Sequence, residues 1–338
     1  MCSAQKILIT GASGFIGSAV VERALQLGYE TWAGIRSSSS REYLTDARIR
    51  FIDLNYADVA TLSAQLQTVA GEEGRIDAVV HVAGITKTAH KDDFDRINFR
   101  HTQNLADALI QSGTMPCCFV FMSTLGAIGA GSGKDFRPIP ADAAPHPDTA
   151  YGRSKLKAES YLKSLDGFPY VILRPTGVYG PRDRDYLILM RAVKRGLSVG
   201  AGFGKQLLSF IYIDDLVDTI FTAIQKGIYR KAYNVADGDV HTDATFNDIV
   251  RKVLHKKHLL RLIVPLWLVK PAAWLNEKLF ALMGKATTFN SDKYHIMKQR
   301  NWACDITPLR EELDFCPRYR LEEGVAKTVA WYQSQKWL

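Results

Sequence analysis

The sequence contains few cysteines, and their placement excludes a disulfide-stabilised scaffold. Only five occur among 338 residues, and two of them, Cys117 and Cys118, are adjacent within an apolar run. An odd count with this placement is typical of a reduced, cytoplasmic protein. No basic region followed by an apolar stretch precedes the first apolar run at 7–9, so no signal peptide is expected.

The sequence also lacks a long apolar stretch that is free of charge. The most apolar segment, residues 259–283, is interrupted by four charged residues and two prolines. It is therefore not expected to span a bilayer, which requires about 18 or more apolar residues. We favour a pair of amphipathic helices that cover a substrate pocket. The alternative is a helix in a membrane interface, with basic residues 251–258 included, so that membrane contact would involve 251–283.

Composition and charge exclude several classes of protein. With 47% apolar and 23% charged residues the chain has ordinary globular composition rather than that of a disordered protein. A formal net charge of +8 fits a nucleic-acid, membrane or anionic small-molecule partner. No basic patch coincides with a nucleic-acid-binding module, so no nucleic-acid partner is expected. The histidines and cysteines lack metal-ligand spacing, so no metal is expected.

Short apolar runs alternate with helical patterns through the first half of the chain. This alternation implies right-handed crossovers and predicts an α/β fold with a doubly wound parallel sheet of the Rossmann type. The expected strands are 6–10, 29–35, 48–54, 76–84, 117–124 and 170–175, and the expected helices are 15–28, 58–70, 93–112 and 150–165.

The rhythm changes after residue 180, which suggests two domains. Residues 1–180 are expected to form a nucleotide-binding domain, and residues 181–338 a smaller, mostly helical, substrate-binding cap. Within the second part, residues 210–236 read as strand, helix and strand. We expect this segment to return to the first domain, so that the two domains are not continuous in sequence.

A glycine-rich loop, TGASGFIG at 10–17, follows the first expected strand and opens the first expected helix. In this context the first glycine allows a tight turn, the second a close approach to a pyrophosphate, and the third close helix packing. The helix N-terminus adds free N–H groups and positive potential. The cofactor contacts expected here are Gly11, Ser13, Gly14, Phe15, Ile16 and Gly17.

The end of the second strand indicates which form of the cofactor is bound. NAD sites usually carry a carboxylate at this position, whereas this chain has Arg36 followed by four serines, 37–40. A guanidinium with nearby hydroxyls suits a 2′-phosphate. NADP is therefore favoured over NAD. Asp53 and Leu54, at the end of the third strand, are expected to contact the adenine.

A tyrosine and a lysine, Tyr151 and Lys155, lie one helical turn apart and therefore on one helix face. A nearby ammonium favours phenolate, so we expect the pKa of Tyr151 to fall from about 10 toward neutrality. Such a tyrosine exchanges a proton with an alcohol or a carbonyl oxygen. The Tyr-x-x-x-Lys spacing occurs three times in the chain. Only this pair follows the fifth strand, which ends in Ser123 and Thr124, where ligands bind in such sheets.

These motifs, in this order, resemble the extended short-chain dehydrogenase/reductases. That family includes nucleotide-sugar epimerases and dehydratases, 3β-hydroxysteroid dehydrogenases and dihydroflavonol reductases. The resemblance also rests on HVAG (81–84), Asn98, MST (122–124) and RPTGVYGP (174–181), and it covers nearly the whole chain.

The resemblance implies a role for individual residues. Tyr151 would be the acid/base, Lys155 would tune it and hold the cofactor's ribose, and Thr124 would hydrogen-bond the substrate oxygen. A homodimer is the family expectation. The further cofactor contacts that the resemblance implies are Val82, Ala83, Gly84, Ser123, Pro175 and Val178.

Two departures from the family pattern concern the substrate. Nucleotide-sugar enzymes commonly carry Asn where this chain has Gly177, and Arg-Asp where it has Leu208 and Ser209. These losses favour a less polar alcohol or ketone. The leading hypothesis is thus an NAD(P)-dependent oxidoreductase that acts on a small molecule. The alternatives are a nucleotide-sugar epimerase or dehydratase with transient hydride transfer and, more remotely, a non-catalytic nucleotide-sensing protein.

Overall fold

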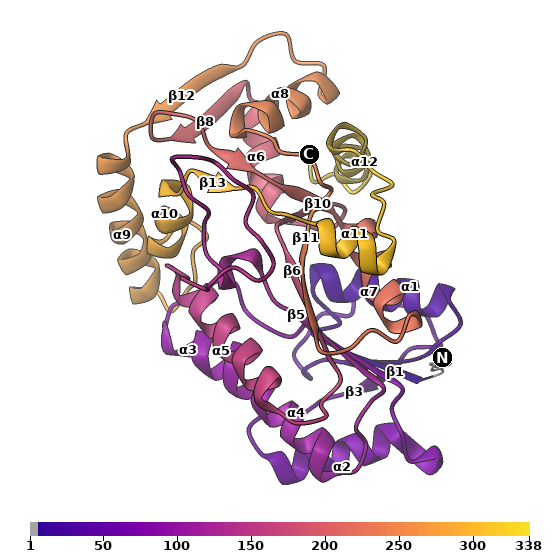
Figure 1. The fold of residues 1–338 in the computed structure, drawn as a ribbon. Helices are drawn as coiled ribbons and strands as arrows, with labels where there is room; N and C mark the ends of the chain where they lie inside the picture. Colours follow the sequence, from indigo (N-terminus) through magenta and orange to yellow (C-terminus); the bar gives the residue numbers. More distant parts are fainter. Residues whose placement is uncertain (1–5) are drawn as a thin grey trace.

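A seven-stranded parallel sheet forms the centre of the molecule in the computed structural model, which describes residues 6–338 (Figure 1). The predicted Rossmann-type fold is confirmed. The chain reverses its direction of winding between β1 and β4, which is where doubly wound sheets bind ligands. From edge to edge the strands are β3 (Arg50–Ile52), β2 (Glu30–Gly34), β1 (Lys6–Thr10), β4 (Ala78–His81), β5 (Cys118–Met122), β6 (Tyr170–Pro175) and β11 (Lys231–Val235).

Helices cover both faces of this sheet. One face packs against α1 (Phe15–Gln26) and α7 (Ile213–Gln225), and the other against α2 (Val59–Ala70), α4 (His101–Gln111) and α5 (Ala150–Ser164). Alternate strand residues enter alternate cores, as the twofold repeat of a strand requires: the even-numbered residue of the run 7–9 faces one core and its neighbours the other. Burial on both faces explains why these strands read as continuous apolar runs.

The helix expected at 93–112 is interrupted. It begins as α3 (Asp92–Phe94), continues as a π-helical turn, η2 (Asp95–Arg100), and becomes α4. The π turn buries Asn98, whose amide donates to the Ile85 carbonyl and to the Ser154 hydroxyl, both at 3.0 Å. Single π turns of this kind often occur at functional sites.

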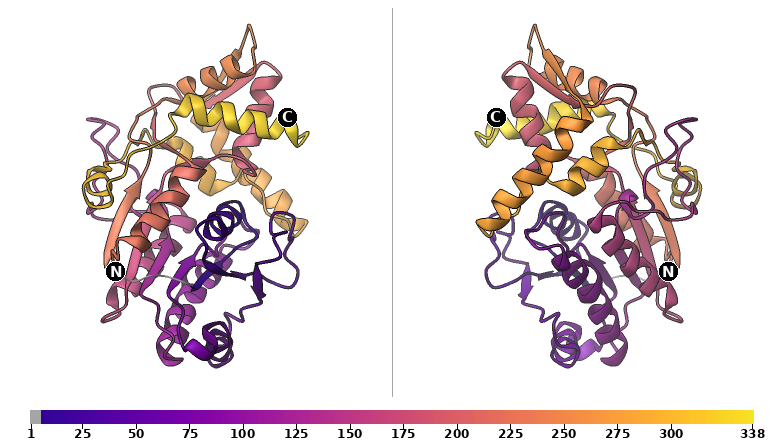
Figure 2. Two further views of the ribbon diagram at one scale, coloured as in Figure 1. Left: turned by 90° about the vertical axis from the view of Figure 1, so that its right-hand side faces the viewer. Right: turned by 90° about the vertical axis from the view of Figure 1, so that its left-hand side faces the viewer.

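The cap contains three short parallel ribbons and several helices, which lie above the sheet in Figure 2. The ribbons pair β7 (Gly177–Tyr179) with β10 (Phe210–Tyr212), β8 (Leu197–Ala201) with β12 (Leu260–Val264), and β9 (Leu207–Leu208) with β13 (Asn301–Trp302). The helices are α6 (Asp185–Lys194), α8 (Asp243–Val253), α9 (Leu266–Leu282), α10 (Ser291–Lys298), α11 (Thr307–Leu313) and α12 (Leu321–Ser334).

Residues 210–236 contribute to both parts of the molecule. Strand β10 pairs with β7 in the cap, whereas α7 packs on the large sheet and β11 forms its edge beside β6.

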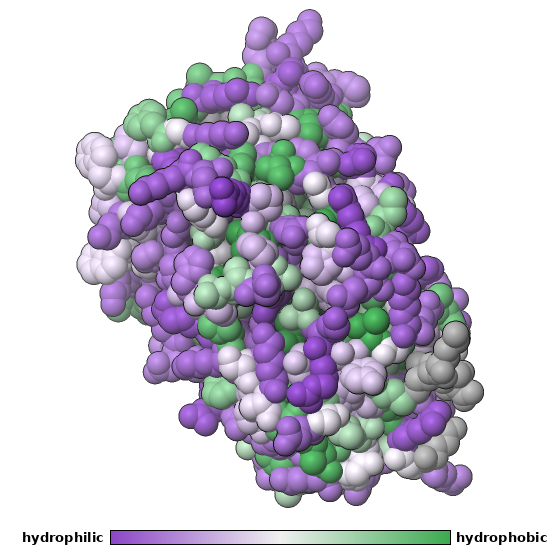
Figure 3. Space-filling model, in the orientation of Figure 1, coloured by the Kyte–Doolittle hydropathy of each residue, from purple (hydrophilic) through white to green (hydrophobic). Residues whose placement is uncertain are grey.

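The expectation of two helices in 259–283 is wrong. The segment forms strand β12 and then the single helix α9, because Pro265 lies at the helix start and Pro271 is accommodated within the helix. Only Val269 and Ala273 of α9 are buried. Several apolar side chains of α9 and β12 are therefore exposed, and green and pale residues are interspersed with purple ones along the left-hand edge of the molecule (Figure 3). Within residues 6–338, no helix is long and apolar enough to cross a membrane.

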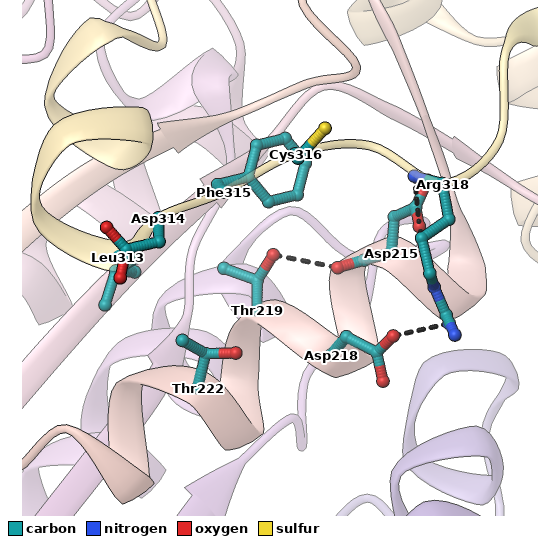
Figure 4. A pocket seen from close by; sticks show the side chains of 9 residues that line it. All are labelled: Asp215, Asp218, Thr219, Thr222, Leu313, Asp314, Phe315, Cys316 and Arg318. Carbon is teal, nitrogen blue, oxygen red and sulfur yellow. Dashed lines mark hydrogen bonds and ion pairs between the residues drawn. The ribbon is translucent and has the colours of Figure 1, made fainter.

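A small cavity of about 110 Å³ lies between α7 and the segment that follows α11 (Figure 4). Several polar groups that line the cavity form ion pairs or hydrogen bonds with one another. Arg318 pairs with Asp215 and Asp218, and the Thr219 hydroxyl donates to the Asp215 carbonyl at 2.8 Å. Because α7 covers the face of the sheet opposite α5, this cavity is separate from the site that contains Tyr151.

Candidate active site

The glycine-rich loop connects β1 to α1, and its glycines have no side chains that could cover the backbone N–H groups. Gly11 has a φ of +66°, and a Cβ at Gly17 would lie 2.2 Å from the Gly11 carbonyl oxygen. Gly14 is the N-cap residue, and no side chain caps the first turn of α1. The first-turn N–H groups and the positive end of the helix dipole therefore remain available to an anion. This geometry fits a pyrophosphate.

A buried hydrogen-bond network holds β4 in register beside this loop. The two ring nitrogens of His81 lie 2.7 Å from the Thr10 hydroxyl and 2.9 Å from the Thr102 hydroxyl. The Thr10 hydroxyl also accepts from the Ala83 N–H at 3.2 Å. Burial lowers the pKa of His81 well below its usual value, so the ring is neutral. The network fixes the path of Val82, Ala83 and Gly84 along the expected cofactor cleft.

The ends of β2 and β3 bring the expected adenosine-contacting residues together. The N–H of Ser37, next to Arg36, donates to the Asp53 carboxylate at 2.8 Å, and Leu54 is buried. The backbone N–H of Arg36 donates to the Ser39 hydroxyl at 3.2 Å, which folds the serine run into a turn. Arg36, just after the C-terminal end of β2, is exposed.

Tyr151 and Thr124 meet at the C-terminal end of β5. Thr124 is the N-cap of the short turn η3 (Leu125–Ala127), and Tyr151 lies in the first turn of α5, which Thr149 caps through the Gly152 N–H at 3.0 Å. Burial raises the pKa of Tyr151 to about 12, and a hydrogen bond with Thr124 partly opposes that rise. The two predicted catalytic hydroxyls are thus in contact.

Lys155 lies one turn further along α5, in a buried position. Its amine donates to the Met122 carbonyl at 2.8 Å and lies 4.8 Å from the centre of the Phe121 ring. It also faces Gly84, where a Cβ would lie 3.2 Å from Nζ. Burial lowers the pKa of Lys155 to about 8, against the opposing effect of Glu159.

The predicted fall in the Tyr151 pKa is wrong for this structure. The phenol loses its hydration on burial, and this effect outweighs the other influences on its pKa. The ammonium of Lys155 is directed at a backbone carbonyl, and the group that lowers the phenol pKa is Thr124.

A buried ion pair fastens the elements that carry these residues. Arg174 on β6 and Glu159 on α5 pair at 2.6 Å, with exposures of 2% and 0%. The Ser123 hydroxyl donates to the same glutamate. The Ser123 side chain therefore belongs to this network, so contact between Ser123 and a cofactor would involve its backbone. Pro175 ends β6, and Val178 lies in β7 just beyond it.

Asp292, at the start of α10 in the cap, is a site residue that the sequence did not predict. Its carboxylate accepts from the backbone N–H groups of Ala150 and Tyr151, at 3.3 and 3.2 Å. A carboxylate is favourable at a helix N-terminus. Because it comes 141 residues after Tyr151, no local pattern identifies it.

An aromatic side chain occupies the space beside Gly177. A Cβ there would lie 2.2 Å from the Tyr186 hydroxyl oxygen and 3.1 Å from the Phe210 ring. The Tyr186 ring packs against Phe210 and Phe246, with centroids 6.0 and 5.3 Å away. This wall therefore leaves no room for an asparagine at position 177.

Of the other Tyr-x-x-x-Lys pairs, the one at the C-terminus has a structural role. The Tyr332 hydroxyl is fully buried and donates to the Asp183 carbonyl at 2.7 Å.

The fold and the site define the class of the protein. A model of the NAD dependent epimerase/dehydratase family matches residues 7–236. The chain belongs to that family and is an enzyme of the extended short-chain dehydrogenase/reductase type, which uses a nicotinamide dinucleotide; this confirms the resemblance noted above.

Individual relatives differ in their chemistry. The chain is 28% identical to UDP-glucose 4-epimerase of Vibrio cholerae, with 96% of this chain and 94% of that protein covered. It is 26% identical to the decarboxylating sterol-4-alpha-carboxylate 3-dehydrogenase of Saccharomyces cerevisiae, over 98% and 99%. The structure of UDP-glucose 4-epimerase from Thermotoga maritima with UDP-glucose superposes with a TM-score of 0.77 at 24% identity, over 98% and 99%. That structure shows the shared fold.

Proposed function

We propose that this enzyme transfers a hydride between a nicotinamide dinucleotide and an apolar substrate that carries an alcohol or a ketone. The main support is the wall at Gly177, where Tyr186 and Phe210 fill the volume that an asparagine side chain would need. Leu208 replaces the arginine that commonly contacts a substrate diphosphate in the nucleotide-sugar enzymes. A largely aromatic wall without the asparagine and the arginine suits a substrate without a diphosphate.

The cleft fits the cofactor. The bare first turn of α1 would hold the pyrophosphate, Asp53 and Leu54 the adenine, and Lys155 the nicotinamide ribose. Bound nicotinamide supplies the hydride acceptor or donor. We propose NADP rather than NAD, because the exposed Arg36 and the serine turn that follows it suit a 2′-phosphate.

The chain's own residues would handle the oxygen and its proton. Thr124 orients the substrate oxygen, and Tyr151 takes the hydroxyl proton as the carbinol C–H bond breaks, or returns it during reduction. To accept a proton near neutral pH, Tyr151 must have a pKa below the value of about 12 found here. A nearby positive charge lowers a phenol pKa, so this role requires the Lys155 ammonium to turn from the Met122 carbonyl, which it contacts here, toward the phenol.

The second candidate is a nucleotide-sugar epimerase or dehydratase, which the Vibrio cholerae relative favours. Such an enzyme shows no net oxidation of its substrate and stabilises on binding nucleoside diphosphates. A purely nucleotide-sensing protein is the least favoured, since binding alone does not require the Thr124–Tyr151 contact. We further propose a cytoplasmic homodimer that pairs through α4 and α5, as the family resemblance implies.

A thermal-shift experiment separates these functions. We expect NADP to raise the Tm more than NAD, and UDP and dTDP to leave it unchanged in the presence of cofactor. Stabilisation by a nucleoside diphosphate would overturn the apolar-substrate proposal. A larger effect of NAD than of NADP would overturn only the role of Arg36.

A further inference from the structure

Helix α9 presents an apolar stripe to solvent, the reverse of an ordinary surface helix. Leu268, Leu275, Leu279 and Leu282 are exposed by 43%, 53%, 51% and 86%. Their spacings of seven, four and three residues place them along one face, roughly opposite the side that buries Val269 and Ala273.

Two tryptophans and a strand extend this stripe. Trp267 and Trp274 are exposed by 72% and 56%, and Leu262 and Ile263 of the neighbouring strand β12 by 45% and 53%. Lys270 and Trp274 also line a groove of about 320 Å³ between α9 and α10. An exposed apolar surface of this extent marks an interaction site. We call the four leucines and two tryptophans the leucine–tryptophan face.

Nearly all of the chain's net charge lies in the segment of sequence that carries this face. Residues 251–285 contain eight lysines and arginines and one acid, Glu277, a net +7 of the formal +8. Glu277 is already occupied, because it accepts from the Ser291 N–H at 2.9 Å and pairs with Lys91.

The two arginines of this segment, Arg251 and Arg261, pair with Asp248. The lysines of this segment differ from its arginines in this respect. In the part of the chain that the structure describes, no ion pair involves Lys252, Lys256, Lys257, Lys270, Lys278 or Lys285.

We propose that the leucine–tryptophan face docks the enzyme onto the surface of an anionic phospholipid bilayer, with α9 lying in the interface. Leucines enter the acyl boundary, tryptophans prefer the headgroup level, and lysines reach the anionic headgroups. Each basic residue near such a surface adds attraction. A second copy of the chain is a poor occupant, because two faces of the same strong positive charge repel each other. This inference does not depend on the proposed substrate.

Vesicle flotation of the full-length protein tests the proposal. We expect binding to vesicles of phosphatidylcholine with about one third phosphatidylglycerol, weak binding to phosphatidylcholine alone, and release as salt increases. Leu275→Ser/Leu279→Ser and Lys270→Glu/Lys278→Glu should each reduce the partition coefficient by about tenfold or more.

Matched variants elsewhere on the surface serve as controls. Leu27→Ser/Val240→Ser alters two exposed apolar side chains outside both this face and the proposed dimer helices, at 37% and 46% exposure. Lys134→Glu/Lys327→Glu makes the same charge change at two exposed lysines on other parts of the chain. Both should bind vesicles within about twofold of the wild type, and all variants should keep their Tm and cofactor affinity.

Three results would overturn the proposal. The first is absence of wild-type binding to anionic vesicles at low salt. The second is equal loss of binding in the face variants and the controls. The third is a wild-type oligomer that fails to bind vesicles and that Leu275→Ser/Leu279→Ser converts to monomers in sedimentation analysis, which would assign the face to a second copy.

Discussion

Removal of the Asp292 carboxylate should weaken catalysis far more than it weakens the fold. Asp292 lies in the substrate-binding cap. Its carboxylate accepts hydrogen bonds from the backbone N–H groups of Ala150 and Tyr151, at the start of the helix that carries Tyr151. In Asp292→Ala the first turn of α5 loses its link to α10. Tyr151 then samples positions further from the substrate oxygen.

The contacts set the size of both effects. A side-chain cap contributes about 0.5–2 kcal/mol, and a carboxylate at the helix dipole about 0.3–1 kcal/mol. The two Asp292 bonds are long, at 3.2 and 3.3 Å, and Thr149 caps the same turn. The free energy of unfolding should therefore fall by only about 1 kcal/mol, or about 2 °C in Tm. Misplacement of Tyr151 by a fraction of an ångström should lower kcat by about 10- to 100-fold.

Steady-state kinetics and cofactor titration test this prediction. In Asp292→Ala, kcat should fall while the cofactor Kd and Tm stay nearly constant. Asp292→Asn, which keeps an acceptor oxygen, should recover part of kcat and thereby separate positioning from loss of charge. An unchanged kcat, or a parallel loss of cofactor affinity and stability, would refute the positioning role.

Three further predictions concern stability and cofactor choice. Glu159→Gln should lower the free energy of unfolding by about 3–5 kcal/mol in urea titrations, because it leaves the buried Arg174 charge uncompensated; a small effect would contradict this account of the pair. Burial raises the pKa of Asp237 to about 7 from 3.8. The stabilisation of the folded state by the protonated carboxyl is therefore full below about pH 4 and is lost by about pH 7, and it adds at most about 4 kcal/mol to the free energy of unfolding. Asp237→Asn should therefore flatten the fall in stability over that range, and parallel pH profiles for the two proteins would contradict the shift. Arg36→Ala should raise the Kd for NADP by about tenfold or more and leave that for NAD nearly unchanged; equal changes would refute the phosphate contact.

Local patterns were sufficient to predict the nucleotide-binding half. The strand runs are apolar because both faces of the sheet are covered. The glycine positions follow from close backbone approaches such as Gly17 to Gly11. Tyr151 and Thr124 each lie next to a strand or helix end that the pattern itself defines, so the sequence places both at the same edge of the sheet.

The remaining features depend on contacts between distant residues. Asp292 and Tyr186 reach the site from the cap, and no short spacing connects either to Tyr151 or Gly177. The π turn buries Asn98, and one partner of that side chain, Ser154, lies 56 residues away on α5. The pKa of Tyr151 depends on burial, which the Tyr-x-x-x-Lys spacing does not report.

The central claim is tested most directly by following reduced cofactor with purified enzyme. The substrates would be a panel of long-chain and polycyclic ketones beside UDP-glucose, with wild type and Tyr151→Phe compared. The account predicts oxidation of NADPH by at least one apolar ketone, its loss in Tyr151→Phe, and no conversion of UDP-glucose. Formation of an epimerised sugar nucleotide without net oxidation of cofactor, and no turnover of any ketone, would contradict it.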